Sequence, residues 1–126
     1  MFGYLLVFVG AGIGGALRHG VNLSTARTFG TGFPYGTLTV NVVGSLVMGV
    51  LAGYFAFRGE ATQAWRLFLT TGILGGFTTF SSFSLDTALL YERGELGLTL
   101  LYVAVSFACS VGALFAGLWA VRSLVQ

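Results

Sequence analysis

Charged side chains are scarce in this chain, and lysine is absent altogether. Asp, Glu, Lys and Arg together make up 8% of the 126 residues, against roughly a quarter in an ordinary soluble domain. Hydrophobic residues make up 56% of the chain, and the mean hydropathy is +0.89. A soluble fold needs more polar surface than this composition supplies. The composition therefore predicts an integral membrane protein.

Other scarcities exclude further classes of function. The net charge of +2 comes from six arginines that are spread along the chain rather than clustered, so nothing suggests nucleic-acid binding. The one cysteine, Cys109, cannot form an intrachain disulfide, and a small buried hydrophobe is its simplest interpretation. No repeat, low-complexity tract or soluble extension is visible. We expect a single membrane domain over residues 1–126 that is not an enzyme.

Four apolar segments follow one another, and a membrane-spanning helix needs about 20 residues. They lie at about residues 2–18, 36–57, 65–91 and 96–121. The first connection, Asn22 to Tyr35, holds the only proline, Pro34, and the other two connections are short. No positive residue precedes the first segment, and Gly15-Ala16-Leu17 is a poor cleavage site, so we expect a retained span rather than a signal peptide. The pattern predicts an all-α, multi-pass domain of four transmembrane helices.

The third segment combines a glycine pair with a cluster of hydroxyl side chains. Gly75-Gly76 is followed closely by Thr78, Thr79, Ser81, Ser82 and Ser84. An unpaired backbone group is costly in hydrocarbon, so a helix can open inside the membrane only where it faces protein, ions or water. Serine and threonine can take over backbone partners when a helix unwinds. We therefore predict that the third helix is broken at Gly75-Gly76 and that the break lines an ion pathway.

Small-residue spacings mark where helices approach one another. Gly10-x-x-x-Gly14, Gly49-x-x-x-Gly53 and Gly72-x-x-x-Gly76 each let two helix backbones come close, as membrane contacts often require. The chain contains 20 glycines, so such spacings arise easily and identify packing rather than a function.

The arginines are almost evenly divided between the two expected membrane faces. One face would carry Arg58, Arg66 and Arg122, and the other Arg27, Arg93 and Arg18. The side of the membrane with more arginine and lysine usually faces the cytoplasm. Because the two sides carry nearly equal numbers of arginines, we predict that the chain inserts in either orientation. Features other than arginine counts could equally fix one topology. In an antiparallel pair, the middle of the third helix would lie opposite its own copy.

Residues 75–83, Gly-Gly-Phe-Thr-Thr-Phe-Ser-Ser-Phe, closely resemble GGxTTFSTF, the third-helix signature of the small fluoride-channel family, the Fluc or CrcB proteins. Only Ser82 departs from that signature. Residues 14–18 (Gly-Gly-Ala-Leu-Arg), 36–41 (Gly-Thr-Leu-Thr-Val-Asn) and 92–94 (Glu-Arg-Gly) agree with the same family. The resemblance implies an antiparallel, dual-topology homodimer in a prokaryotic inner membrane. Such a protein is a passive fluoride channel that limits fluoride toxicity, with two ion pathways and a structural, untransported sodium ion at the dimer interface.

The resemblance also assigns roles to individual residues. The backbone carbonyls of Gly75 and Thr78 would hold the sodium ion, which prefers hard oxygen ligands, and Arg18 would draw anions into a vestibule. Hydroxyls, amides and the positive edges of aromatic rings can replace the hydration of a small anion without trapping it. The residues that would form the fluoride pathway are Asn41, Thr79, Phe80, Ser82, Phe83, Tyr102, Ser106 and Ser110.

Taken one at a time, these residues also have simpler interpretations. Asn41 could bond a neighbouring helix, and Phe80 and Phe83 could pack in lipid or in the core. Tyr102, Ser106 and Ser110 recur every four residues, so they share one helix face, where their hydroxyls could line a polar track or bond another helix. For these residues, it is the family resemblance that favours the pathway.

Two other functional classes remain as alternatives. A dual-topology drug/proton antiporter also has four short helices, but its chemistry needs an acid deep in the first helix, and residues 2–17 contain none. A membrane protein that acts only through helix association would leave the hydroxyl cluster unexplained. Asp86, the one acid within a span, is expected to be a helix-end or pairing group, with an ion or proton site as its alternative. His19 is expected at the membrane interface.

Overall fold

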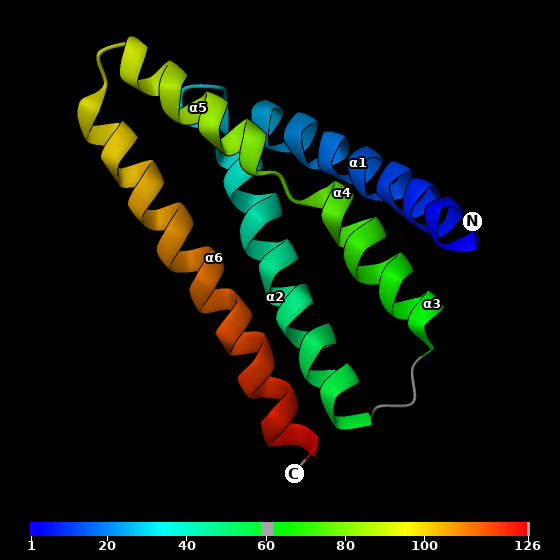
Figure 1. Ribbon diagram of the computed structural model, residues 1–126. Helices are drawn as coiled ribbons and strands as arrows, with labels where there is room; N and C mark the ends of the chain where they lie inside the picture. Colours follow the sequence, from blue (N-terminus) through cyan, green and yellow to red (C-terminus); the bar gives the residue numbers. More distant parts are fainter. Residues whose placement is uncertain (59–61, 126) are drawn as a thin grey trace.

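The computed structural model describes residues 1–58 and 62–125, and it is built from helices joined by short turns (Figure 1). The long helices are α1 (Phe2–Phe29), α2 (Tyr35–Arg58) and α6 (Leu96–Val125). Between α2 and α6 lie α3 (Gln63–Arg66), the π-helix η1 (Leu67–Leu74), α4 (Gly75–Phe77) and α5 (Phe80–Glu92). Within the described ranges, three helices are long and apolar enough to cross a membrane: Phe2–Phe29, Tyr35–Phe57 and Leu96–Leu124. The all-helical, multi-pass architecture agrees with the sequence prediction.

The first helix is longer than its apolar segment. The sequence predicted a span that ends at residue 18 and a connection from Asn22 to Tyr35, but α1 continues to Phe29. In the added turns, the Thr25 hydroxyl donates to the Val21 carbonyl one turn back, at 3.0 Å. The helix ends at Gly30, whose φ of 80° is readily adopted only by glycine. The drop in hydropathy after Leu17 therefore marks the end of the apolar part of α1 and not the end of the helix.

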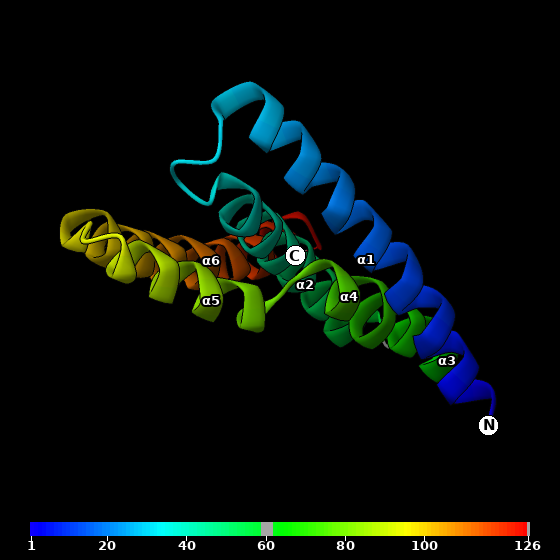
Figure 2. The same cartoon turned by 90° about the horizontal axis from the view of Figure 1, so that it is seen from above.

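The helices pack in two groups, α2 with α6 and α1 with η1 and α4, and glycines lie at the contacts in both. Helix α2 packs mainly on α6, and the two lie side by side in both views (Figures 1 and 2). At this seam, a Cβ added to Gly49 would meet the backbone of Leu114. Helix α1 crosses η1 and α4, where Gly10 and Gly14 lie against the backbone of Gly72 and Ile73. The predicted small-residue spacings therefore mark close helix contacts, as membrane packing requires.

Most large apolar side chains point away from the molecule rather than into a core. The buried apolar residues are few, and Tyr102, Leu90 and Val40 are the largest that are fully enclosed. By contrast, Phe8 is 78% exposed and Phe107 is 72% exposed. A continuous apolar exterior of this kind matches a lipid environment and not water.

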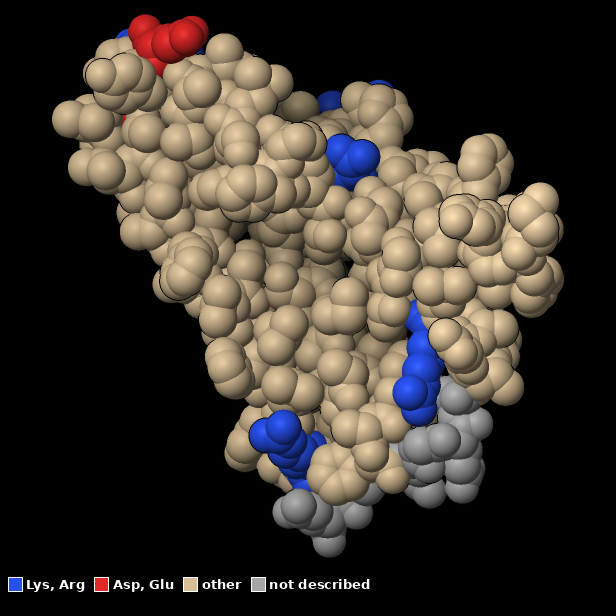
Figure 3. All heavy atoms as spheres, in the orientation of Figure 1, with Lys and Arg blue, Asp and Glu red and all other residues tan. Residues whose placement is uncertain are grey.

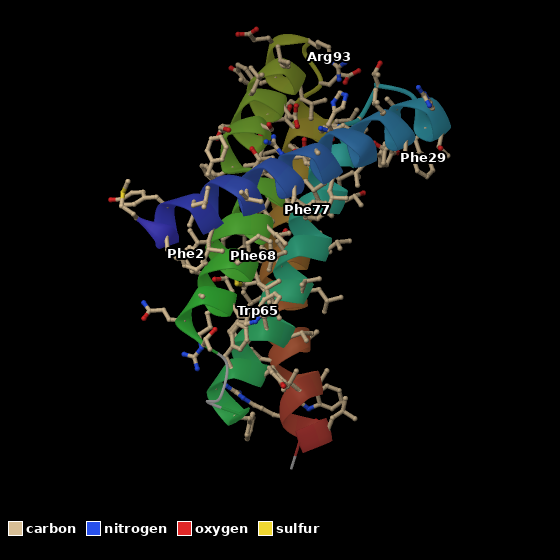
Figure 4. All side chains as sticks on the ribbon, turned by 90° about the vertical axis from the view of Figure 1, so that its right-hand side faces the viewer. Phe2, Phe29, Trp65, Phe68, Phe77 and Arg93 are labelled. Carbon is tan, nitrogen blue, oxygen red and sulfur yellow. The ribbon has the colours of Figure 1, made fainter. Side chains whose placement is uncertain are left out.

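The two turns at one end of the molecule are fastened to each other. Arg93, in the turn between α5 and α6, donates to the carbonyl of Gly32, in the turn between α1 and α2, at 2.8 Å. The same guanidinium forms a salt bridge with Glu95 at 3.2 Å. Figure 3 shows acidic side chains gathered at this end. Figure 4 shows α1 running obliquely past the segment that carries Trp65, Phe68 and Phe77.

Candidate ion-conduction site

The helical path is interrupted at Thr78 and Thr79, and this interruption organises the site. Thr78 has φ −87° and ψ 158°, and Thr79 has φ −155° and ψ 119°, so both are extended. The sequence predicted that the helix opens at Gly75-Gly76. That position was wrong, because Gly75 is helical (φ −61°, ψ −38°) and α4 continues to Phe77.

A side chain from another helix explains why the helix opens where it does. The Asn41 side chain of α2 accepts a hydrogen bond from the backbone N–H of Thr79 at 2.8 Å and donates one to the Thr79 carbonyl at 3.0 Å. In a continuous helix the Thr79 N–H would instead donate to the Gly75 carbonyl. Asn41 thus pairs with an extended residue as a neighbouring strand would. The glycine pair serves close packing, since a Cβ on Gly76 would collide with the backbone of Ala11.

Thr79 also starts the next helix. Its hydroxyl accepts a hydrogen bond from the Ser82 N–H at 3.1 Å, which is the usual N-cap arrangement. On the other side of the break, the Thr78 hydroxyl and N–H both donate to the Leu74 carbonyl, at 2.9 and 3.0 Å. The two threonines therefore close both helix ends with their own hydroxyls.

Two carbonyl groups at the break are left over. Among the described residues, the carbonyl oxygens of Gly75 and Thr78 have no hydrogen-bond partner. The carbonyl between them, that of Gly76, accepts a hydrogen bond from the Arg18 guanidinium Nε at 3.1 Å. Oxygens with free lone pairs and no competing donor are the ligands that a hard cation needs. The donor type fits the sodium ligands that the sequence suggested.

A groove of about 340 Å³ lies beside the break, between α2, α5 and α6. It collects most of the side chains that the sequence assigned to the fluoride pathway. The described residues that line it are all uncharged. The pathway candidates among them are Asn41, Thr79, Phe80, Phe83, Ser106 and Ser110.

Two serines in the groove are buried without a partner. The hydroxyl oxygens of Ser106 and Ser110 are inaccessible, and neither has a hydrogen bond within the described part of the chain. Ser106 is only 6% exposed as a whole residue. Phe80 and Phe83, whose ring centres are 5.5 Å apart, line the same groove. A buried hydroxyl without a partner is unusual and calls for a ligand, a water or an ion.

Two of the assigned residues lie outside the groove lining. Tyr102 is fully buried, donates its hydroxyl to Asp86 at 3.2 Å, and packs its ring on Phe83 with 5.2 Å between ring centres. Ser82 lines a separate pocket of about 290 Å³ together with Thr37 and Asp86. Asp86, expected as a helix-end or pairing group, thus accepts a hydrogen bond from Tyr102.

Arg18 is held by the helix end rather than extended into open space. Its side chain reaches from α1 to α4 and bonds the Gly76 carbonyl, as described above. A positive charge at the C-terminal end of a helix is favourable because the carbonyl dipoles point toward it. Arg18 therefore lies beside the break and does not line the groove.

Comparison with known proteins identifies the family of this chain. Residues 5–118 match the family described as "CrcB-like protein, Camphor Resistance (CrcB)". The chain belongs to this family. It is 64% identical over 121 residues to "Fluoride-specific ion channel FluC 2" of Nitrobacter hamburgensis, covering 96% of this chain and 98% of that one. It is 60% identical to "Fluoride-specific ion channel FluC" of Rhodopseudomonas palustris, with the same coverage, and 55% identical to the protein of that name from Granulibacter bethesdensis, covering 100% and 99%.

In this CrcB-like chain, the groove includes residues that the sequence analysis did not select. Gly44 and Ser45 of α2 line it one turn after Asn41. The spacing of Asn41 and Ser45 places both on one helix face, so a search for polar residues at that spacing would have found Ser45. Gly44 could not have been found this way. It makes room for the Thr78 side chain, a contact that only the tertiary structure reveals.

Proposed function

We propose that this protein is a fluoride-selective ion channel. It would let fluoride leave the cell passively, driven by the inside-negative membrane potential, and so limit fluoride toxicity. The proposal rests on the family membership and on relatives that are named as fluoride-specific channels. The observation that carries it within the structure is the pair of buried hydroxyls of Ser106 and Ser110, which have no partner among the described residues and lie in an uncharged groove that Phe80 and Phe83 also line.

The groove suits a small, strongly hydrated anion. Hydroxyl hydrogens of Ser106 and Ser110 can replace lost water, and Asn41 keeps one amide hydrogen after bonding Thr79. The edges of the Phe80 and Phe83 rings carry partial positive charge and would hold the anion weakly enough to release it. No cationic side chain lines the groove within the described residues. Weak neutral donors favour passage, because a fixed positive charge would trap the ion.

The proposed assembly is an antiparallel, dual-topology homodimer in the inner membrane. In it, α3, η1, α4 and α5 would together form the third of four spans, broken at Thr78-Thr79. Phe80 supports this assembly, because it is 77% exposed in one chain although it belongs to the proposed pathway. The near balance of arginines supports the inverted arrangement. A second copy would cover the open side of the site.

A structural sodium ion is the proposed centre of that dimer. The carbonyl oxygens of Gly75 and Thr78 would hold it, and the two-fold axis would double this set of hard ligands. When bound, the ion would neutralise carbonyl dipoles that otherwise face one another across the interface. This chain contributes by keeping those carbonyls free: Asn41 takes the Thr79 N–H that a continuous helix would donate to Gly75.

Fluoride efflux from reconstituted vesicles tests the proposal directly. Vesicles loaded with potassium fluoride should release fluoride when valinomycin is added, because potassium efflux removes the membrane potential that opposes anion efflux. Matched vesicles loaded with potassium chloride should not release chloride. Proton-coupled cation uptake would indicate an antiporter, and the absence of any flux would indicate a protein that acts through helix association. Either result would overturn the channel proposal.

The sodium proposal has its own test in the same vesicles. Replacing sodium by N-methylglucamine on both sides, after extensive dialysis of the protein, should abolish fluoride efflux, and sodium should restore it. Efflux that persists without sodium would remove the structural ion while leaving the channel itself intact. The two proposals can therefore fail separately.

A further inference from the structure

A second polar pocket lies at the α3 end of the molecule, away from the conduction groove. Its volume is about 500 Å³, and the residues that line it are Gln63, Arg66, Leu67, Thr70 and Thr71. The pocket starts at α3 and continues one turn into η1. It contributes nothing to the groove beside Thr78-Thr79, because the two share no residue.

The guanidinium of Arg66 lies over an aromatic ring, and its Nε lacks a hydrogen-bond partner within the described ranges. Its central carbon lies 5.3 Å from the centre of the Phe55 ring, so an aromatic face supports one side of the group. Its Nε is buried and has no hydrogen-bond partner among the described residues. The only salt bridge found in the described ranges, Arg93 with Glu95, lies at the other end of the molecule. A buried guanidinium N–H without an acceptor is costly, and an anion with several oxygens is its natural complement.

Of the two hydroxyl groups next to Arg66, that of Thr71 fits the same ligand, because the Thr70 proton is already used. The Thr70 hydroxyl donates to the Arg66 carbonyl at 2.6 Å, which ties this turn of the backbone together. Thr71 is exposed and lines the pocket, so its hydroxyl is accessible to a ligand. Gln63 adds an amide donor. Guanidinium, hydroxyl and amide donors around one cavity suit a phosphate group.

An apolar groove borders this pocket at Leu67. That groove has a volume of about 580 Å³, and its lining comes mainly from the first two turns of α1: Met1, Gly3, Tyr4, Val7, Phe8 and Leu67. Leu67 lines both cavities and packs over Gly3, where an added Cβ would lie 3.2 Å from the Leu67 Cδ2. Trp65, which is 59% exposed, stands near the same end, as aromatic residues do at a membrane surface.

We propose that this composite cavity binds one anionic phospholipid. Its phosphate group would occupy the Arg66 pocket, and an acyl chain would lie in the groove along the first turns of α1. Because both cavities are lined by Leu67, a polar and an apolar cavity lie next to each other, which favours an amphipathic lipid over free phosphate. A carboxylate of a second copy is the rival ligand, and the oligomeric state of Arg66→Gln in the experiment below distinguishes it from a lipid. The proposal does not depend on ion conduction.

Native mass spectrometry of the full-length, delipidated protein provides the test. The protein is titrated with long-chain phosphatidylglycerol, and bound lipid and oligomeric state are read from the same spectrum. We expect one tight lipid per chain and a dissociation constant about tenfold larger for Arg66→Gln, because a hydrogen-bonded charge is lost. Arg122→Gln removes an exposed arginine in the last turn of α6 and is the matched control; it should leave the constant unchanged.

Further arms separate the sources of phosphate. Short-chain phosphatidylglycerol should bind more weakly, and millimolar inorganic phosphate should not displace the long-chain lipid. Thr71→Val serves as a second variant, since its side chain is exposed and its loss should weaken lipid binding without unfolding the protein. Equal lipid retention by wild type, Arg66→Gln and Thr71→Val would overturn the proposal. So would displacement by inorganic phosphate, or loss of dimers in Arg66→Gln with no change in lipid binding.

Discussion

The stretch from Gln63 to Glu92 has two parts that pack in opposite ways. The first part, η1 with α4, lies tightly against α1, where glycines on both sides bring the backbones together. The second part, α5, buries only Leu90, and its first turn faces the groove with Phe80 77% exposed. The first part holds the break at Thr78-Thr79 in position by packing on α1. The second part carries Phe80 and Phe83, which line the groove. Substitutions should therefore affect folding in one part and conduction in the other.

The largest expected effect is on the first part. In Gly14→Ala, the new Cβ would collide with the Ile73 backbone, and neither backbone can yield without separating α1 from η1. We expect a loss of about 2 kcal/mol or more of folding free energy and a severe loss of purified protein. Gly12→Ala is the matched control, because nothing lies within 4 Å of its Cβ position. Thermal unfolding in detergent and yield of monodisperse protein measure both. Equal stability of the two variants would show that the seam is not rigid.

The next effect is at the junction of the two parts. Asn41→Ala leaves the Thr79 N–H and carbonyl without partners, at a cost of about 1–3 kcal/mol for each unsatisfied group. We expect fluoride efflux to fall by about tenfold or more, since the geometry of the break changes, while dimers remain. Thr28→Ala, at an exposed position near the end of α1, is the control. Normal efflux in Asn41→Ala would remove this residue from both the pathway and the break.

A smaller effect is expected in the second part. Phe80→Ile removes an aromatic edge from a side chain that is 77% exposed in one chain, so the fold of the chain should be kept and efflux should fall several-fold. Phe115→Ile, at a 63% exposed position of α6 that does not line the groove, should leave efflux unchanged. Rates of fluoride release from matched vesicles give the comparison. If both variants lost the same activity, a general effect of lost aromatic surface would explain the result better than a site.

The smallest effect should come from a single hydroxyl. Ser106→Ala removes a buried group that has no partner among the described residues, so the unfolding temperature should stay the same or rise. Efflux should nevertheless fall by a few-fold, since one donor to the ion is lost. Thr99→Ala is the contrast, because the Thr99 hydroxyl donates to the Glu95 carbonyl at 2.8 Å and its loss should not alter efflux. A lower unfolding temperature in Ser106→Ala with unchanged efflux would indicate an internal structural bond instead.

Local sequence predicted the helices and the glycine contacts better than it predicted the break. Hydropathy located the apolar stretches, because each residue carries its own transfer free energy. It placed the end of α1 too early, since the polar residues from Arg18 to Thr28 remain helical outside the apolar stretch. The glycine pair suggested an opening at Gly75-Gly76, yet glycine there permits close approach to Ala11 and stays helical.

Recognising the family signature selected candidate residues but did not show how they are arranged. Asn41, Phe80, Phe83, Ser106 and Ser110 come from three different helices, and the structure brings them to one groove. Tyr102 lies four residues before Ser106 on the same helix face, but its ring packs on Phe83 and its hydroxyl donates to Asp86. Residues that share a helix face can still differ by a turn in what they contact, and spacing alone does not distinguish them.

The sequence by itself determined two things: composition indicated a membrane protein, and hydropathy along the chain located the apolar segments. Both are sums over single residues. The position of the break was decided by tertiary structure, since it depends on Asn41 reaching the backbone of Thr79, a residue 38 positions away. The tertiary structure likewise decided which groups lack a hydrogen-bond partner within residues 1–58 and 62–125: the carbonyls of Gly75 and Thr78, the hydroxyls of Ser106 and Ser110, and the Nε of Arg66. Hydrogen-bond satisfaction is a property of the packed chain and is not written in any local pattern.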